Sequence, residues 1–343
     1  MKPAHYPDLK QLIDRLDKRN RQRQAARAIM AGSALLGLLV LASPFLQKDQ
    51  GTLVLTPEQP KTAAPGTVPN AFQSAHITGR AAIVYDLTTK EVLYEKNAKT
   101  QLPLASLTKL ITAYASVSTL APTTPITITE AALAEDGDSG LTLGERFAFE
   151  DLLRFALVSS SNDAAEAIAD AAATSQQTSG KNLLASAISA IGLPQTYALN
   201  GTGLDVNESV SGGYGSAFDV AQLAGALIEK APEIARSTTQ SSITIRSLDG
   251  KAHTLPNTNQ DVVHMPNLLL SKTGFTDLAG GNLAIVYDAG IDHPVAVVVL
   301  GSTREGRFAD VEQLLSLTSA HFAQIPATHS GAISTSATST VIR

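Results

Sequence analysis

The stretch NLAIVYDAGIDHPVAVVVLGS (residues 282–302) places two runs of apolar, largely β-branched residues on either side of Gly290–Pro294. This pattern predicts a β-hairpin, because such runs favour strands while Gly and Pro favour the turn between them. A second hairpin is predicted in AAIVYDLTTKEVLYEKNA (residues 81–98), with its turn at residues 86–90. We therefore expect one antiparallel sheet in which the two ends of a domain meet.

The region between the two hairpins has the periodicity of helices. Apolar residues recur at three-to-four spacing in residues 107–120, 149–173 and 216–231, and again in residues 309–324 after the second hairpin. Strands at both ends and helices between them are typical of an antiparallel sheet covered by helices. The predicted fold class is therefore α/β of the α+β kind, an antiparallel sheet flanked by helices with a helical subdomain.

The composition of the 343-residue chain excludes several classes of function. Cys is absent, which rules out disulfides, thiol nucleophiles and thiolate metal sites. Trp is absent and aromatic residues make up 5%, so base-stacking platforms are not expected. Residues 1–27 carry +5, from eight Lys/Arg and three Asp/Glu, which leaves −10 for the rest of a chain of net charge −5. An acidic body argues against nucleic-acid binding, which needs a basic face.

Residues 28–46, AIMAGSALLGLLVLASPFL, contain no charged side chain and are about long enough to cross the hydrocarbon core of a bilayer. The basic residues before them place residues 1–27 in the cytoplasm by the positive-inside rule. We therefore expect a single-pass signal-anchor in the bacterial cytoplasmic membrane, with the rest of the chain outside the cytoplasm. The alternative is a cleaved signal peptide, which the long basic region and Pro44 disfavour.

Segments of biased composition border the predicted domain. Residues 47–74 are rich in Pro, Thr, Gln and Ala and are expected to form a flexible stalk. Residues 327–343 are rich in Ser and Thr and are expected to be a disordered tail. The remaining residues, 75–326, have a size that one α/β domain can reach.

Ser106 and Lys109 stand three residues apart in the apolar stretch LASLTKLITA (residues 104–113). On a helix the two side chains would share one face, about 5–6 Å apart at Cβ. A serine hydroxyl becomes a nucleophile when a base takes its proton, and a lysine can do so only when burial has made it neutral. Pro103 indicates a nearby helix N-terminus, whose amides would favour a developing negative charge. The alternative is a lysine that extends outward from an ordinary helix.

Two further polar groups interrupt apolar segments. Ser160 and Asn162 form a turn between two helical runs, where they would either cap the second helix or face a cleft. Lys272 and Thr273 end an apolar run that predicts a strand, and could bind a substrate carboxylate. Gly274 would leave room for a peptide beside that strand. Taken alone, the last three residues are better explained by a hairpin with a polar tip.

The motifs S-x-x-K, S-x-N and K-T-G occur in the order found in penicillin-binding proteins and class A β-lactamases. With all three intact, residues 76–323 resemble the serine-type D-Ala-D-Ala carboxypeptidases, the low-molecular-weight penicillin-binding proteins of peptidase family S11. The resemblance extends to NGTGLD (200–205), NTN (257–259) and GSTREGRFADVEQLL (301–315). It implies a β-lactamase/transpeptidase-like fold. Relatives often carry a further β-rich domain and a C-terminal amphipathic anchor, and here we expect residues 28–46 to take the anchor's place.

The resemblance also implies a role for each motif residue. Ser106 would be the nucleophile that forms an acyl-enzyme, and Lys109 its general base. Ser160 would relay a proton to the leaving amine, while Asn162 would hold the substrate amide and orient the lysine. The oxyanion would be bound by the backbone N–H groups of Ser106 and Phe275.

The remaining implied roles concern substrate binding. Lys272 would add positive potential, Thr273 would bind the terminal carboxylate, and Gly274 and Phe275 would line the substrate site. Arg304 or Arg307 would be placed to assist carboxylate binding, but an ordinary surface ion pair is the simpler expectation for them.

The implied activity is removal of the terminal D-Ala from peptidoglycan stem peptides, with β-lactam antibiotics as inhibitors. A D,D-endopeptidase that cuts cross-links would use the same residues. A β-lactamase would need a deacylating glutamate, and Glu208 lacks the family's spacing. A non-catalytic wall-binding protein would not need intact motifs. The seven His show no metal-ligand spacing, and neither a metal, a cofactor nor a nucleic-acid partner is expected.

Overall fold

The computed structural model describes residues 70–290 and 292–324. Its centre is a five-stranded sheet of order β10-β11-β12-β1-β2, and every neighbouring pair in it is antiparallel. The strands are β1 (Ala81–Asp86), β2 (Val92–Lys96), β10 (Leu268–Thr276), β11 (Gly280–Asp288) and β12 (Pro294–Ser302). Both predicted hairpins are confirmed, and the ends of the domain meet because β1 pairs with β12, with Ile83 opposite Val298.

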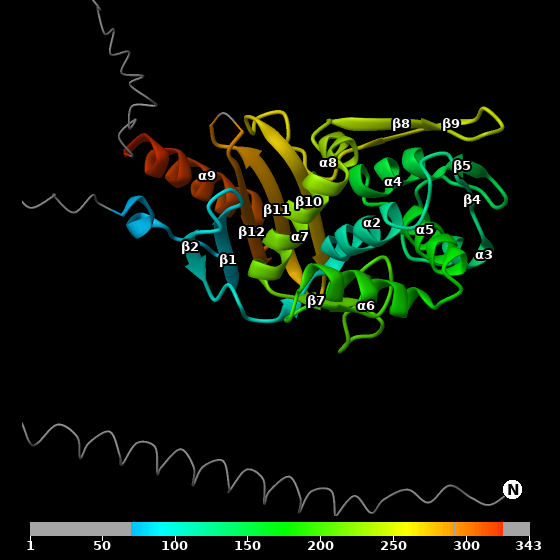
Figure 1. The fold of residues 1–343 in the computed structure, drawn as a ribbon, viewed down its shortest axis with the longest axis horizontal. Helices are drawn as coiled ribbons and strands as arrows, with labels where there is room; N and C mark the ends of the chain where they lie inside the picture. Colours follow the sequence, from blue (N-terminus) through cyan, green and yellow to red (C-terminus); the bar gives the residue numbers. More distant parts are fainter. Residues whose placement is uncertain (1–69, 291, 325–343) are drawn as a thin grey trace, which may run out of the picture. The chain divides into compact units, whose positions relative to one another are not determined.

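Helices cover both faces of the sheet (Figure 1). On one face lie α9 (Gly306–Gln324) and η1 (Ala71–Ser74), and on the other lies α7 (Ala217–Lys230). The strand residues are apolar on both sides for this reason: Ile83 packs into one core and Val84 into the other. Each such fully buried side chain contributes about 1.5–3 kcal/mol to stability.

The helical subdomain predicted from the sequence lies beyond β10. Its helices are α2 (Lys109–Val117), α3 (Glu130–Leu133), α4 (Phe149–Val158), α5 (Asn162–Ser175), α6 (Gly180–Ile191) and α8 (Pro232–Ser237). The short strands are β3 (Leu102–Pro103), β4 (Pro125–Thr127), β5 (Arg146–Ala148), β6 (Tyr197–Ala198), β7 (Gly213–Gly215), β8 (Ser242–Arg246) and β9 (Ala252–Pro256). The predicted α+β class is confirmed.

The start of α7 shows how tertiary contacts modify a local signal. Ser216 and Asp219 have the spacing of a capping box, with an acid one methylene shorter than usual. The Ser216 hydroxyl caps the helix by accepting from the backbone N–H of Asp219. The Asp219 carboxylate instead accepts from the Gln195 N–H and the Thr196 hydroxyl. Only half of the box forms, because the acid serves to hold a neighbouring loop.

The domain begins before residue 75, where the flexible stalk was expected to end. Asn70 caps the η1 turn by accepting from the Phe72 N–H, and the Phe72 ring is 5% exposed. The predicted cytoplasmic segment, signal-anchor and tail lie outside the described residues, as does the stalk up to residue 69. Within residues 70–290 and 292–324, no helix combines the length and apolar character needed to cross a membrane.

Candidate active site

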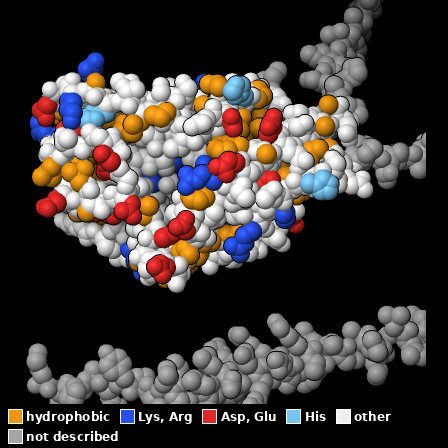
Figure 2. All heavy atoms as spheres, turned by 180° about the vertical axis from the view of Figure 1, so that it is seen from behind, with side chains coloured by type: hydrophobic (Ala, Val, Ile, Leu, Met, Phe, Trp, Pro, Cys, Tyr) orange, Lys and Arg blue, Asp and Glu red, His pale blue; other side chains and the backbone are white. Residues whose placement is uncertain are grey.

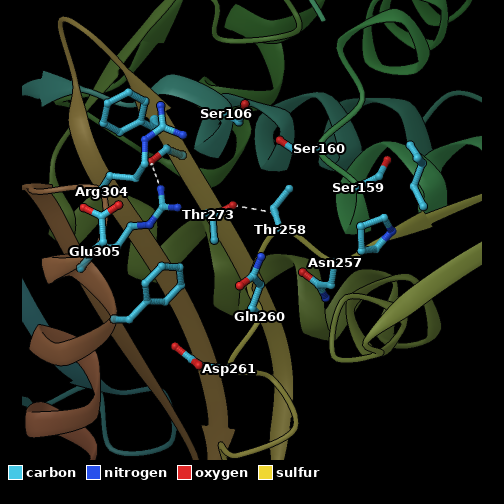
Figure 3. Close-up of a pocket in the computed structure, with 16 residues that line it drawn as sticks. Ser106, Ser159, Ser160, Asn257, Thr258, Gln260, Asp261, Thr273, Arg304 and Glu305 are labelled. Carbon is cyan, nitrogen blue, oxygen red and sulfur yellow. Dashed lines mark hydrogen bonds between the residues drawn. The ribbon is translucent and has the colours of Figure 1, made fainter. Parts of the chain in front are cut away.

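The structure brings the residues of all three motifs together. Ser106 lies in the short 3-10 turn η2 (Ala105–Thr108), and Lys109 begins α2 directly after it. Ser160 and Asn162 lie at the junction of α4 and α5. Lys272, Thr273 and Gly274 belong to β10. Figure 3 shows Ser106, Ser160 and Thr273 around one pocket. The chain between the motifs is long, so only the fold makes them neighbours.

The turn that carries Ser106 is fixed by its surroundings. Ala105 has a φ of 49°, a left-handed conformation that costs a residue with a Cβ of order 1 kcal/mol or more. Gly203 packs so closely that a Cβ there would lie 1.9 Å from the Ala105 carbonyl oxygen. Asn282 of β11 donates to the carbonyls of Pro103 and Leu104, at 3.0 Å each. Ser106 was expected near a helix N-terminus, and the structure places it in a 3-10 turn that leads directly into α2 at Lys109.

The Lys109 amine lies at the centre of the site and contacts three oxygens. Its Nζ is 2.9 Å from Ser106 Oγ, 2.6 Å from Asn162 Oδ1 and 2.8 Å from the Thr202 carbonyl oxygen. The side chain is 1% exposed, which contradicts the alternative of a lysine extending outward. Three fixed acceptors therefore hold the amine against the Ser106 hydroxyl.

Burial also changes the acidity of this amine. Desolvation disfavours the charged form and lowers the pKa of Lys109 to about 7, although nearby carboxylates oppose the effect. Those carboxylates belong to Glu135, Asp163 and Glu166. At neutral pH a substantial fraction of the amine is thus free to accept a proton, as a base for a serine hydroxyl must be.

The junction between α4 and α5 serves both as a helix cap and as part of the site. Ser161 accepts from the Ala164 N–H and caps α5. Ser160 precedes it with a φ of 60°, which is rare for a residue with a Cβ. Asn162 accepts from Lys109 and donates from Nδ2 to the Asp136 carbonyl. The cap is made by the serine between them, so Ser160 is left to line the cavity and Asn162 to contact Lys109.

Lys272 is a second buried lysine, again 1% exposed. Its Nζ donates to Ser160 Oγ at 2.8 Å and to the Thr273 carbonyl at 3.0 Å. Burial holds the pKa of Lys272 well below its ordinary value, and the positive charges of Lys109 and Arg307 lower it further. The two lysines thereby link the α4–α5 junction both to the nucleophile turn and to β10.

Four of the motif residues line a cavity of about 720 Å³. One wall contains Ser106 and Ser160, and the other contains Thr273 and Gly274 of β10. The Thr273 hydroxyl donates to that of Thr258 at 2.6 Å (Figure 3). Figure 2 shows the surface of one face hollowed beside a group of Lys and Arg side chains. A polar cavity with basic groups suits an anionic peptide end.

Gly274 was expected to leave room for a peptide, and the structure gives another reason for it. A Cβ at this position would lie 2.8 Å from the Leu104 carbonyl oxygen and 3.3 Å from the Ser106 nitrogen. Distances below 3.0 Å between a Cβ and a backbone oxygen require movement of the chain. Gly274 therefore allows β10 to approach the nucleophile turn, in addition to lining the cavity.

Arg307 differs from the surface ion pair that was the simpler expectation. It is 7% exposed and lines the cavity, and its Nη1 donates to the Gly274 carbonyl at 2.7 Å. Its Nε has no hydrogen-bond partner, and no carboxylate pairs with it among residues 70–290 and 292–324. Burial lowers the pKa of Arg307 to about 10, so the group stays charged at neutral pH. Arg304 is exposed and its guanidinium lies 3.8 Å from the centroid of the Phe275 ring.

Several residues of the site had no separate signal in the sequence. Asn282 is an asparagine in an otherwise apolar strand, and its Oδ1 also accepts from the Gly301 N–H. The Thr202 carbonyl contacts Lys109, and a backbone group leaves no trace in a side-chain pattern. Glu135 and Glu166 approach Lys109 from separate segments. A polar residue in a buried strand was the one available clue, and it applies only to Asn282.

Comparison with known proteins agrees with this geometry. The family model for D-alanyl-D-alanine carboxypeptidase matches residues 68–304. The chain is 31% identical to the D-alanyl-D-alanine carboxypeptidase DacD of Salmonella typhimurium over 277 residues, covering 76% of this chain and 68% of the relative. It is also 31% identical to a D-alanyl-D-alanine endopeptidase of Pseudomonas aeruginosa over 289 residues, covering 81% and 86%.

Solved structures show the same likeness. Penicillin-binding protein D2 from Listeria monocytogenes, in its ampicillin-bound form, superposes with a TM-score of 0.61 at 27% identity, covering 71% of this chain and 97% of that one. The expected transpeptidase-like fold is confirmed by this match. From the family match and from curated relatives of both kinds, the chain belongs to the D-alanyl-D-alanine carboxypeptidase family of serine D,D-peptidases.

Proposed function

We propose that the protein is a membrane-anchored serine D,D-carboxypeptidase, which removes the terminal D-Ala from peptidoglycan stem peptides. The observation that carries the proposal is the contact of Ser106 Oγ with the buried Lys109 amine, beside a cavity that also contains Arg307. The first pair supplies a nucleophile with its base, and the arginine supplies a site for a free carboxylate.

In the proposed reaction, neutral Lys109 takes the proton of Ser106 while Oγ attacks the carbonyl carbon of the D-Ala-D-Ala bond. The oxyanion is stabilised by the backbone N–H groups of Ser106 and Phe275. Their proximity is supported by Gly274, which precedes Phe275 and packs against the Ser106 nitrogen. The C–N bond then breaks, and Ser160, hydrogen-bonded to Lys272, gives its proton to the leaving amine and regains one from Lys109, which had taken it from Ser106. Water hydrolyses the resulting ester and releases the shortened peptide.

Substrate binding in this proposal depends on the terminal carboxylate. Thr273 and Arg307 both line the cavity, and the Arg307 guanidinium, with a pKa of about 10, is charged at neutral pH. Asn162 would bind the peptide amide as well as the Lys109 amine. A substrate that ends in a carboxylate therefore gains hydrogen bonds to charged groups, each worth about 1.5–3 kcal/mol.

Covalent labelling by a fluorescent penicillin tests the nucleophile. The full-length wild-type chain is expected to be labelled, and Ser106→Ala is expected to lose the label entirely. Ser118→Ala is the matched control, because Ser118 lies at the other end of α2 and donates to the Tyr114 carbonyl. Equal labelling of Ser106→Ala and wild type, or no labelling of wild type, would contradict the proposal. Release of D-Ala from a pentapeptide, followed in parallel, reports on the peptidase reaction itself.

A D,D-endopeptidase is the second candidate, because the relatives of this chain include endopeptidases as well as carboxypeptidases. Both reactions would use Ser106, Lys109 and Ser160, so the catalytic groups do not separate them. Digestion of uncross-linked pentapeptide and of cross-linked muropeptides, side by side, does. A rate on the cross-linked substrate that exceeds the rate on pentapeptide would assign the endopeptidase activity.

A β-lactamase activity is not favoured. Glu208 is exposed and does not line the cavity that contains Ser106. Glu135 and Glu166 lie close to Lys109, but neither of them lines this cavity. Among the described residues, the carboxylates that line the cavity are Asp261 and Glu305, and neither of them acts on Lys109. We expect penicillins to acylate the protein and to be released slowly.

The membrane anchor is proposed from the sequence alone, because residues 28–46 are uncharged and follow a basic segment. Fractionation of cells that express the full-length chain should place it in the cytoplasmic membrane. Extraction by high salt would contradict an anchor in the bilayer, whereas release by detergent would support it.

A further inference from the structure

Three carboxyl groups approach Lys109 from the helical subdomain. They belong to Glu135, which follows α3, and to Asp163 and Glu166 of α5. None of them lines the cavity that contains Ser106. The proposed reaction therefore uses none of them directly, although each one acts on the amine that takes the serine proton.

Glu166 is a half-buried residue of α5. It lies one helical turn after Asn162, so the two side chains project from the same face of α5. Its Oε2 is inaccessible to solvent and has no hydrogen-bond partner within residues 70–290 and 292–324. The carboxyl packs beside Gly201, where an added Cβ would lie 3.6 Å from Oε2. An unsatisfied buried carboxylate oxygen is costly, which favours the protonated form.

Glu135 approaches the same loop from the other side. Its Oε2 accepts from the Thr202 hydroxyl at 3.4 Å, and the carbonyl oxygen of Thr202 accepts from Lys109 at 2.8 Å. Residues 201–202 thus contact Glu166, Glu135 and Lys109. The geometry connects two carboxyls to the amine through one short segment of backbone.

The pKa values of Glu166 and Lys109 fall in the same range. Burial, with help from the charges of Asp170 and Glu135, raises the pKa of Glu166 to about 7. Burial lowers the pKa of Lys109 to about 7. Burial also raises the pKa of Glu135. Groups that interact and titrate together gain and lose protons as a unit rather than separately.

We propose that Glu166 and Glu135 are positioning residues that share a proton with Lys109, and thereby set the pH range in which this amine acts as the base. The inference rests on the proposed function, in which Lys109 deprotonates Ser106. When these carboxyls are ionised, their negative charge favours protonated Lys109, which cannot act as a base. When they are protonated, they no longer favour the charged amine, and neutral Lys109 can accept a proton.

Other charged groups also lie around this cluster. Asp163 is buried at the start of α5 and accepts from the Ser139 hydroxyl. Asp170 lies one turn beyond Glu166 and acts on that carboxyl but not on Lys109. On the β10 side, the positive charge of Lys109 lowers the pKa of Lys272. Within the described residues, only Glu135 and Glu166 both raise the pKa of Lys109 and contact residues 201–202.

The test is the pH profile of acylation by a fluorescent penicillin, measured on the full-length chain from pH 5 to 10. In wild type the rate constant should rise with pH as Lys109 loses its proton. Glu166→Gln removes a charge that favours protonated Lys109, so the rise should move to lower pH and become steeper. A shift of about half a unit multiplies the rate on the acidic limb about threefold. Glu135→Gln should act in the same direction, and the double variant should shift the profile further.

Glu130→Gln is the matched control, because Glu130 is an exposed carboxylate at the start of α3 and acts on none of Lys109, Glu135 and Glu166. It should leave the profile within about 0.2 units of wild type. Glu166→Asp, which keeps the charge, should restore most of the wild-type profile. Profiles of Glu166→Gln and Glu135→Gln that coincide with wild type, in chains whose circular dichroism is native, would overturn the inference. An unlabelled wild type at every pH would instead contradict the proposed function.

Discussion

The two walls of the cleft each bury a lysine to the same extent, yet the two lysines have different neighbours. On the helical wall, Lys109 is 1% exposed and is approached by the carboxylates of Glu135, Asp163 and Glu166. On the wall formed by β10, Lys272 is also 1% exposed, but the charges that act on it are those of Lys109 and Arg307. Burial is equal, so the difference between the walls lies in the sign of the surrounding charge.

This difference teaches what each wall can do. Carboxylates partly offset the desolvation of Lys109 and leave its pKa at about 7, where it exchanges protons near neutral pH. Cations around Lys272 add to the desolvation and create a positive region, with the unpartnered Nε of Arg307 close by. One wall is suited to moving a proton and the other to binding an anion.

Replacement of Lys109 should give the largest effect and test the helical wall. Lys109→Met keeps the volume and removes the base, so penicillin acylation should fall about 10²–10⁴-fold, the usual contribution of general base catalysis. Lys181→Met, an exposed lysine of α6, is the control and should acylate at the wild-type rate. A loss of less than tenfold in Lys109→Met would show that another group takes the serine proton.

Replacement of Arg307 should give the next largest effect and test the anion-binding wall. Arg307→Gln should lower kcat/KM for a peptide with a free carboxylate about 10–100-fold, because a charged hydrogen bond is lost. Arg304→Gln removes an exposed arginine that stacks on Phe275 and should cost much less. A peptide amide should react poorly with wild type and no worse with Arg307→Gln. An equal loss on both substrates would mean that Arg307 supports the fold rather than the carboxylate.

The smallest effect on activity is expected from a substitution at the contact between the two walls, which should also lower stability. Gly274→Ala places a Cβ 2.8 Å from the Leu104 carbonyl, so β10 or the nucleophile turn must move. Overpacking of this kind costs about 1–3 kcal/mol in the free energy of unfolding, measured by urea titration, and acylation should slow with it. Gly290→Ala is the control, since nothing lies within 4 Å of an added Cβ there. Equal stability of the two variants would show that the walls have room to separate.

Much of this molecule follows from its sequence, for reasons that are local. The hairpins around residues 86–90 and 290–294 were predictable because each consists of two runs of apolar, largely β-branched residues separated by turn-forming residues. This pattern indicates two strands and a turn without reference to residues far away in the sequence. The helix over residues 217–230 followed from its apolar period and its Ser216 cap. The motif residues Ser106, Lys109, Ser160, Asn162, Lys272 and Thr273 were identifiable because their order along the chain matches a known set.

Tertiary structure decided how those residues act. The lowered pKa of Lys109 depends on packing around its amine and on three acceptors from separate segments, which no single stretch contains. Arg307 acquired its place in the cavity because α9 follows β12 directly and brings the guanidinium to the Gly274 carbonyl. Gly274 is required by a backbone more than 160 residues away in sequence. Residue types and spacing are local properties that a sequence records, whereas desolvation and close approach exist only once the chain has folded.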